Sequence, residues 1–492
     1  MEKNALHRTA IGLSLLCSAL ALAIATTSSV LYATNFWTDT NLYFTIGRGM
    51  KHGLMVYRDL FDHKGPLLFM LYALCAAVSE TSFIGVFLLE ITSFAVMVYF
   101  AWRTVSLYGE GKLTLLVIPL TALATACSTA FNQGGSAEEF CLPALMLAIW
   151  CALARMREAC PKPERLHMVF GAAMGWVFAI KFTDCGLFFG LAFAMLCYEW
   201  RLNGFKCAFV SGMLMIAGML IVVAPVSVYL MVNGIFDDTV QVYFIANLFE
   251  YGGAPMSFVG HIYNALAYLR TQSAANPFLA VPAMMGCVFA TIDALLHRRK
   301  GFLFEMIAAP MAAGLLLLFC YWGEMAHPYY ALVFAALVPL GLIPLGWLAP
   351  RVKGCTPAVL AAALTLAILP VCRVSCQAAP LLAVEKEEMA QTVFAQIIRE
   401  EENPTLLDLC SLDHGFYLAG NVLPNCRYFA NNNLNTKEKR DALDGYLDEG
   451  RTMFVVSRWE DPGENYTQIA EHSSPFDLND MRTFKLYKRV EK

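Results

Sequence analysis

Charged residues are scarce in this chain. Asp, Glu, Lys and Arg make up 15% of its 492 residues, whereas soluble domains average about 25%. The shortage excludes an ordinary soluble enzyme. The 35 basic and 39 acidic residues give a net charge of −4, so the chain lacks the basic excess that is typical of nucleic-acid-binding proteins. The 13% aromatic content excludes a disordered chain.

Common catalytic and metal-binding motifs are missing as well. The sequence contains no P-loop, no GxSxG, no HExxH and no CxxC pair. Its 16 cysteines lie mostly inside apolar runs, as Cys17, Cys127 and Cys287 do. In such runs a thiol behaves as a small apolar side chain. The cysteine pattern therefore predicts neither a metal framework nor a disulfide framework.

Long hydrophobic segments are abundant. Hydrophobic residues make up 58% of the chain, and a helix needs about 20 of them in a row to cross a bilayer core. The candidate segments are roughly 10–33, 66–80, 83–102, 113–130, 139–154, 168–182, 184–200, 207–232, 277–296, 302–321, 328–348 and 356–373. The sequence predicts a polytopic α-helical membrane protein with about 11–13 transmembrane helices, and 10–33 is interpreted as the first of these and not as a signal peptide.

The positions of Lys and Arg predict how the chain crosses the membrane. They cluster in four connecting loops, which are expected to be cytoplasmic: 155–165, 201–206, 297–300 and 351–353. The amino terminus is then cytoplasmic, and the loops 35–64 and 131–138 both lie outside. Three apolar segments separate these two loops, and three crossings cannot join points on one side. The short segment 66–80 is therefore expected to be broken, re-entrant or in-plane.

Charge density rises sharply near residue 376. Residues 377–492 hold 20 acidic and 13 basic residues, whereas 1–376 hold 19 and 22. We therefore expect a membrane body over 1–376 and a small extracytoplasmic α/β domain over 377–492. Its expected helices cover about 385–400 and 436–449, and its expected strands 405–410, 453–457 and 483–488. Cys410 and Cys426 are a candidate disulfide in this domain, because disulfides persist outside the cytoplasm.

The first outer loop, residues 35–65, breaks the charge rule. It places four cations outside the cytoplasm: Arg48, Lys51, Arg58 and Lys64. Cations beside carboxylates at a membrane interface suit a ligand with an anionic phosphate and a reacting hydroxyl. Lys64 precedes a helix that begins at Pro66, and helix amino termini attract anions, so Lys64 and Arg58 are candidate phosphate ligands. The competing interpretation is that these charges only solvate the loop.

The same loop supplies candidate acids. Asp39 is the candidate general base or hydroxyl-orienting residue, and Asp62 and His63 are candidate substrate residues. Asp59 and Asp62 are candidate ligands of a divalent metal, although no obligatory metal is predicted. A helix over about 40–52, capped by Thr38 or Asp39, is expected to lie along the membrane surface.

A second acidic site is expected in the next outer loop. Gly134 and Gly135 indicate a tight turn, and Ser136 is placed to cap a helix whose first turn contains Glu138 and Glu139. Capping alone explains this pattern. The position of the pair at the outer face makes a carboxylate here a candidate site residue.

Two more polar groups lie near the ends of apolar segments. Lys181 and Asp184 are either functional intramembrane charges or a self-satisfying pair one turn apart. Glu324 and His327 either line a substrate cavity or belong to a polar turn whose neighbouring tyrosines lie at the membrane interface.

The first loop resembles that of the multispanning C-type glycosyltransferases, which include the protein O-mannosyltransferases and the bacterial aminoarabinose transferases that modify lipid A. The resemblance covers the first 200 residues and rests on Trp37-Thr-Asp39 and on Arg58-Asp59-Leu-Phe-Asp62-His63-Lys64-Gly-Pro66-Leu67. It implies that Asp39 is the first-loop aspartate of that family and that Lys64 faces a lipid phosphate. Glycine replaces the first proline of the family's Lys-Pro-Pro-Leu element. Glu138 and Glu139 fall where the family has its second-loop acid.

The resemblance implies an activity. A polyprenyl-phosphate sugar in the plasma membrane would donate its sugar, with inversion, to a hydroxyl of a glycan, lipid or protein at the outer face. The implied partners are donor, acceptor and bilayer, without nucleic acid, and the oligomeric state stays open. The alternatives are a transporter or flippase of lipid-linked saccharides, and a non-catalytic membrane protein whose tail binds a partner. Charges gathered at one face favour interfacial chemistry over passage.

Overall fold

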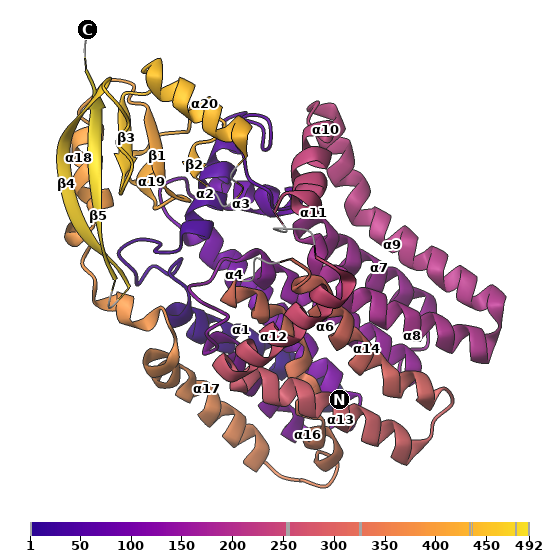
Figure 1. Cartoon of the computed structure of the whole chain (residues 1–492). Helices are drawn as coiled ribbons and strands as arrows, with labels where there is room; N and C mark the ends of the chain where they lie inside the picture. The colour runs from indigo at the N-terminus through magenta and orange to yellow at the C-terminus, as the bar shows by residue number, and fades with distance from the viewer. Residues whose placement is uncertain are drawn as a thin grey trace.

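The computed structural model describes residues 2–251, 256–323, 327–431, 434, 436–477 and 480–490. A helical body carries a small sheet domain on one end (Figure 1). The first half of the body contains α1 (Glu2–Ala25), α2 (Thr38–Lys51), α3 (Pro66–Val78), α4 (Ile84–Ser106), η1 (Lys112–Leu116), α5 (Val117–Ala126), α6 (Ala137–Met156), α7 (Pro163–Ile180), η2 (Phe182–Cys185), α8 (Gly186–Asn203) and α9 (Phe205–Val232).

The second half of the body is also helical. It contains α10 (Phe236–Thr239), the π-helical turn η3 (Val240–Ala246), α11 (Asn247–Phe249), α12 (Phe258–Ala275), α13 (Pro277–His297), α14 (Phe302–Cys320), η4 (Pro328–Leu337), α15 (Val338–Gly341), α16 (Ile343–Leu348) and α17 (Thr356–Ser375).

Nine helices in the described part of the chain are long and apolar enough to cross a membrane. They make the body that of a multi-pass membrane protein. The continuous helix η1–α5 is shorter, and α7 begins with polar residues.

The segment Pro66–Val78 is short for a membrane crossing. Its 13 residues span about 20 Å as a helix, less than the bilayer core. Just beyond it, Glu80 forms ion pairs with Lys51 and His52, so the end of α3 lies beside the end of α2. The two outer loops also meet, because Thr40 donates a hydrogen bond to the Gly134 carbonyl at 3.0 Å. The expectation that this segment is broken, re-entrant or in-plane stays a prediction.

The sheet domain follows α17. It contains η5 (Ala379–Ala383), η6 (Lys386–Glu388), α18 (Ala390–Ile398), β1 (Leu406–Ser411), α19 (Phe416–Gly420), β2 (Ala430–Asn431), α20 (Lys437–Asp448), β3 (Phe454–Ser457), β4 (Tyr466–Asp477) and β5 (Asp480–Arg489). The strand order is β2-β1-β3-β5-β4, with β1 parallel to both neighbours and β4–β5 an antiparallel hairpin.

The sheet domain docks on the first outer loop through buried polar contacts. In α2, Thr45 donates to the Asp413 carboxylate at 2.7 Å, and Arg48 donates to the Tyr417 carbonyl at 3.3 Å. Further along the loop, the Phe61 amide donates to the Arg427 carbonyl at 2.9 Å. Figure 1 shows α2 and α3 below α20 and to the right of α19 and the sheet. The helix at 38–51 is therefore enclosed, with Asp39 to Gly49 all buried.

Three expectations for these regions are wrong. The helix expected to lie along the membrane surface is covered by the sheet domain, because its polar residues are used in docking. Neither Thr38 nor Asp39 caps it, since Trp37 is the N-cap residue and no side chain bonds there. Cys410 and Cys426 are both free thiols. Cys410 belongs to the core cluster that contains Leu406, while its strand neighbours Leu407 and Leu409 face the other side of the sheet.

We predict that Arg48→Met loosens the docking of the sheet domain. The change removes two hydrogen bonds and leaves the buried Asp413 carboxylate without its neighbouring cation, which costs about 1–3 kcal/mol. Limited proteolysis should then cut near residue 380 faster than in the wild type. Arg58→Met is the matched control, because Arg58 is half exposed and forms its ion pair with the neighbouring Asp59. Equal cleavage rates in the two variants would contradict the docking role.

Candidate functional site

A cavity of about 340 Å³ lies where the first outer loop meets the helical body. Its walls come from segments that are far apart in sequence: the loop itself, the end of α7, η3 and α11, the end of α14 and the start of η4. Its polar wall residues include His63, Lys64, Lys181, Asn247 and Tyr330. The opposite walls carry aromatic and aliphatic side chains. The cavity thus offers cationic groups beside an apolar surface.

The backbone around Lys64 is held by three hydrogen bonds. The Tyr57 hydroxyl donates to the Lys64 carbonyl at 2.7 Å, the Lys64 amide donates to Asp62 at 2.9 Å, and the Gly65 amide donates to the Ile180 carbonyl at 2.9 Å. A Cβ atom at residue 65 would lie 2.2 Å from the Ala179 carbonyl oxygen. Proline would also lose the amide hydrogen. The close approach of α7 therefore explains why glycine replaces the family's proline here.

Asp39 lies in the first turn of α2, next to Lys64. Burial raises the pKa of its carboxyl group, and Glu138 acts in the same direction. The Lys64 ammonium and hydrogen bonds from the hydroxyls of Tyr329 and Tyr43 lower that pKa. Asp39 is 7% exposed and is not part of the cavity wall. The structure thus brings Asp39 and Lys64 together, with the lysine on the cavity side.

Asp62 and His63 flank Lys64 in the same buried turn. Burial raises the pKa of Asp62 to about 6, although the Lys64 ammonium opposes the shift. Burial also holds the pKa of His63 well below its usual value. Neither ring nitrogen of His63 has a hydrogen-bond partner among the described residues, and the ring packs on Tyr251 with centroids 4.6 Å apart. His63 is therefore a neutral ring at the cavity wall.

Lys181 links the second outer loop to the end of α7 at the cavity. Its ammonium group forms an ion pair with Glu138 and lies 3.7 Å from an Asp184 oxygen. It also lies 3.7 Å from the centre of the Tyr330 ring. Lys181 and Asp184 are thus a local ion pair, and the same Lys181 ammonium group also pairs with Glu138. Among the described residues at this cavity, Lys181 forms ion pairs and Lys64 does not.

The two glutamates of the second loop have different surroundings. Ser136 caps α6 as expected, since its hydroxyl accepts from the Glu139 amide at 3.0 Å. The Glu139 carboxylate folds back to accept from the Gly135 amide at 2.8 Å and faces Glu90. Only Glu138 reaches the cavity group. The capping pattern in the sequence does not distinguish Glu138 from Glu139. Which of them reaches the cavity depends on which side of α6 faces Lys181.

Arg58 and Asp59 lie apart from this group. The Arg58 guanidinium makes two hydrogen bonds of 3.1 Å to Asp59, and their side chains are 49% and 31% exposed. Asp59 also accepts from the Met55 amide, while Asp62 accepts from the Lys64 amide. One carboxylate is thus bound to a guanidinium and the other lies beside an ammonium group, and a divalent metal shared by Asp59 and Asp62 stays a hypothesis.

The turn before η4 contributes more than the sequence indicates. Glu324 lies outside the described residues. His327 lies 3.4 Å from the Tyr251 hydroxyl, and Tyr329 and Tyr330 interact with Asp39 and Lys181. Tyr330 is buried and Tyr329 is partly buried, and both lie against charged site residues, so they belong to the site and not to a membrane-interface turn. No local motif identifies them, since their partners are about 150 to 290 residues away.

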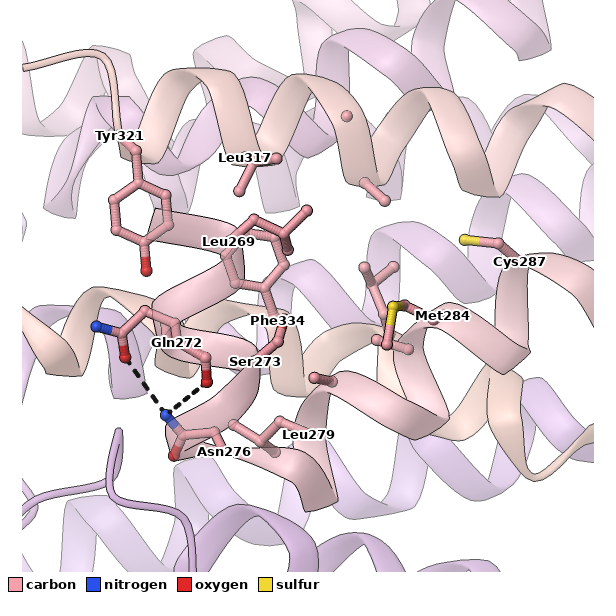
Figure 2. Close-up of a pocket in the computed structure, with 16 residues that line it drawn as sticks. Leu269, Gln272, Ser273, Asn276, Leu279, Met284, Cys287, Leu317, Tyr321 and Phe334 are labelled. Atoms are coloured by element: carbon pink, nitrogen blue, oxygen red, sulfur yellow. Dashed lines mark hydrogen bonds between the residues drawn. The ribbon is translucent and has the colours of Figure 1, made fainter. Parts of the chain in front are cut away.

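A second cavity of about 230 Å³ lies beside the first, between α12, α13, α14 and η4. It is lined by leucine, alanine, methionine and phenylalanine, with Gln272 and Asn276 at one end (Figure 2). Asn276 accepts from Thr129 at 2.8 Å, which places that end near the second outer loop. Tyr321 lines this cavity, while its neighbours Cys320 and Trp322 line the first. The charged and apolar cavities therefore share the end of α14.

No protein-family model matches the chain, and no curated protein matches its sequence. Among solved structures, ArnT from Cupriavidus metallidurans in the apo state aligns with a TM-score of 0.62 at 13% identity, over 99% of this chain and 98% of its own. ArnT from the same organism bound to undecaprenyl phosphate aligns with a TM-score of 0.59 at 13% identity, over 96% and 98%. An Archaeoglobus fulgidus oligosaccharyltransferase aligns with a TM-score of 0.49 at 12% identity, over 90% and 68%.

The helical body with its sheet domain on the loop side has the fold of ArnT. The two ArnT structures, which match nearly the full length of both chains, carry this assignment. Among proteins with this fold, the chain is therefore similar to ArnT from Cupriavidus metallidurans. The resemblance inferred from the first loop is confirmed at the level of the fold.

We predict that Asp62→Asn flattens the pH dependence of stability. The folded-state pKa of Asp62 is raised from 3.8 to about 6, so its contribution to stability is fully present below about pH 4 and is lost as pH rises through 6. The loss amounts to roughly 3 kcal/mol. Melting temperatures of the detergent-purified wild type should fall over this interval more than those of the variant. Parallel curves would show that Asp62 ionises normally.

Proposed function

We propose that this protein is a membrane glycosyltransferase that moves a sugar from a polyprenyl-phosphate donor to a hydroxyl acceptor at the outer face of the membrane, with inversion. The observation that carries the proposal is the convergence of Asp39, Lys64, Glu138 and Lys181 at a cavity that adjoins an apolar one. In this orientation the amino terminus is cytoplasmic and the sheet domain is extracytoplasmic.

The two cavities match the two halves of such a donor. Its phosphate needs a cation, and Lys64 lies at the wall of the charged cavity while Lys181 is engaged by Glu138 and Asp184. Its isoprenoid chain needs an apolar surface within the membrane, which the second cavity supplies. An ArnT structure with the same fold is bound to undecaprenyl phosphate, which supports a donor of this class.

In the proposed reaction, an acceptor hydroxyl attacks the anomeric carbon of the sugar. The new bond joins the acceptor oxygen to that carbon, and the bond from the carbon to the phosphate oxygen breaks. Asp39 takes the hydroxyl proton, since burial makes its carboxylate a stronger base. Polyprenyl phosphate leaves with one more negative charge, which the Lys64 ammonium stabilises.

The other site residues support these two groups. Glu138 holds Lys181 in place, and one of its carboxylate oxygens has no hydrogen-bond partner among the described residues, so it is available to a sugar hydroxyl. Asp62 fixes the Lys64 backbone, and His63 with Tyr251 offers a flat surface. The proposal contains no metal step.

We predict that Asp39→Asn lowers transfer from a radiolabelled polyprenyl-phosphate sugar by about 10²–10⁴-fold, the usual contribution of a general base. Lys64→Gln should lower it by about 10²–10³-fold through lost charge stabilisation. In the wild type, activity should rise with pH as Asp39 loses its proton, and Asp39→Asn should lack this rise. Arg58→Gln, an exposed cation of the same loop, is the control and should retain transfer.

Both variants must remain monodisperse in detergent for this comparison. Full transfer by well-folded Asp39→Asn and Lys64→Gln would end the proposal. Loss of transfer in Arg58→Gln as well would show that the loop charges act together on folding and not through the cavity.

We predict that Gly314→Phe weakens use of a long-chain donor. Gly314 lines the apolar cavity, and no heavy atom lies within 4 Å of a Cβ built there, so the ring can enter the cavity without disturbing the protein. The KM for an undecaprenyl-phosphate sugar should rise about tenfold, equivalent to roughly 1.4 kcal/mol of lost binding, while a short-chain analogue is used as before. Gly12→Phe, at a similarly open glycine of α1, is the control. An unchanged KM for both donors would show that the isoprenoid chain of the donor binds elsewhere.

A further inference from the structure

Three cysteines from two distant segments meet away from the proposed active site. Cys127 follows α5, and Cys372 and Cys376 lie one turn apart at the end of α17. The Cys127 sulfur lies 3.9 Å from each of the other two, and all three ligand atoms lie within 4.8 Å of one another. Cys372 and Cys376 are buried, whereas Cys127 is partly exposed. The group lies where the body connects to the sheet domain.

The sulfur spacing matches a shared metal ion. Zinc–sulfur bonds are about 2.3 Å long, so thiolates around one ion lie about 4.0 Å apart in a trigonal site and about 3.8 Å apart in a tetrahedral one. A disulfide instead needs sulfurs about 2.05 Å apart. The observed 3.9 Å falls between the two metal geometries.

The surroundings favour a soft ion. Thiolate ligands select zinc and monovalent copper over magnesium or calcium. The group contains three sulfurs and no carboxylate. Cys127 is the only one of the three on the solvent-accessible side, so water can reach a fourth coordination position there.

We propose that Cys127, Cys372 and Cys376 bind one thiophilic metal ion of the zinc or copper(I) class. The ion would join the end of α5, which leads into the second outer loop, to the end of α17, which leads into the sheet domain. It would thereby fix the position of the sheet domain relative to the loop that carries Glu138. This structural site is independent of the proposed transfer reaction.

The test measures metal bound to the full-length protein. The wild type, Cys127→Ser, Cys376→Ser and the control Cys355→Ser are purified without oxygen from cells supplied with zinc or, separately, copper. Cys355 is an exposed cysteine before the other end of α17. Elemental analysis should find one ion per chain in the wild type and control and background amounts in the other two. X-ray absorption should show sulfur ligands at about 2.3 Å, and the metal that gives this signal identifies the ion.

A second measurement uses only the wild type, so that a misfolded variant does not decide the outcome. The bound ion should protect all three cysteines from alkylation, and removal of the ion by a chelator should expose them and lower the melting temperature. Absence of metal under both supplements would overturn the proposal. A disulfide between Cys127 and either partner in the anaerobically purified protein would also overturn it, as would full metal content in both serine variants.

Discussion

Charged groups have to be kept in a part of the molecule from which water is largely excluded, and the rest of the structure is arranged around this requirement. Asp39, Asp62 and Lys64 are each at most 7% exposed. Such groups remain charged only when opposite charges and hydrogen bonds are fixed around them. A loop alone does not provide that order, because loops are more mobile than the helices and strands they connect. The body supplies one anchor through α7, and the sheet domain supplies the other through α2.

The sheet domain is therefore part of the site even though no strand lines the cavity. Its contacts with Thr45 and Arg48 hold the helix that begins next to Asp39. Its contact with the Phe61 amide holds the chain three residues before Lys64. Each contact is a buried hydrogen bond whose partners would be costly to leave unpaired. The position of the sheet domain and the geometry of the first outer loop are thus coupled. An ion bound where the body connects to the sheet domain would stabilise both.

The features predictable from sequence are those set by neighbours in the chain. The Ser136 cap and the short helix at 66–78 follow from local patterns and segment length. The separate roles of Glu138 and Glu139 depend on packing against α7 and α4, which no local signal encodes. β4 was not expected because its Gln468–Ser474 stretch is largely polar, and it is paired only along β5. The three cysteines have no spacing motif, because about 245 residues separate Cys127 from Cys372.

The position of Lys64 between the cavity and Asp39 couples the two halves of the proposed reaction. In the free protein the Lys64 ammonium lowers the pKa of Asp39 and so weakens it as a base. A donor phosphate at the cavity wall would share that positive charge, and the attraction between Lys64 and Asp39 would then be partly offset. The Asp39 carboxylate would become more basic once donor is bound. Bond breaking at the phosphate draws on the same ammonium group, so activation of the acceptor and stabilisation of the leaving group both depend on one lysine. The hydrogen bond from Gly65 to α7 holds that lysine's backbone in place.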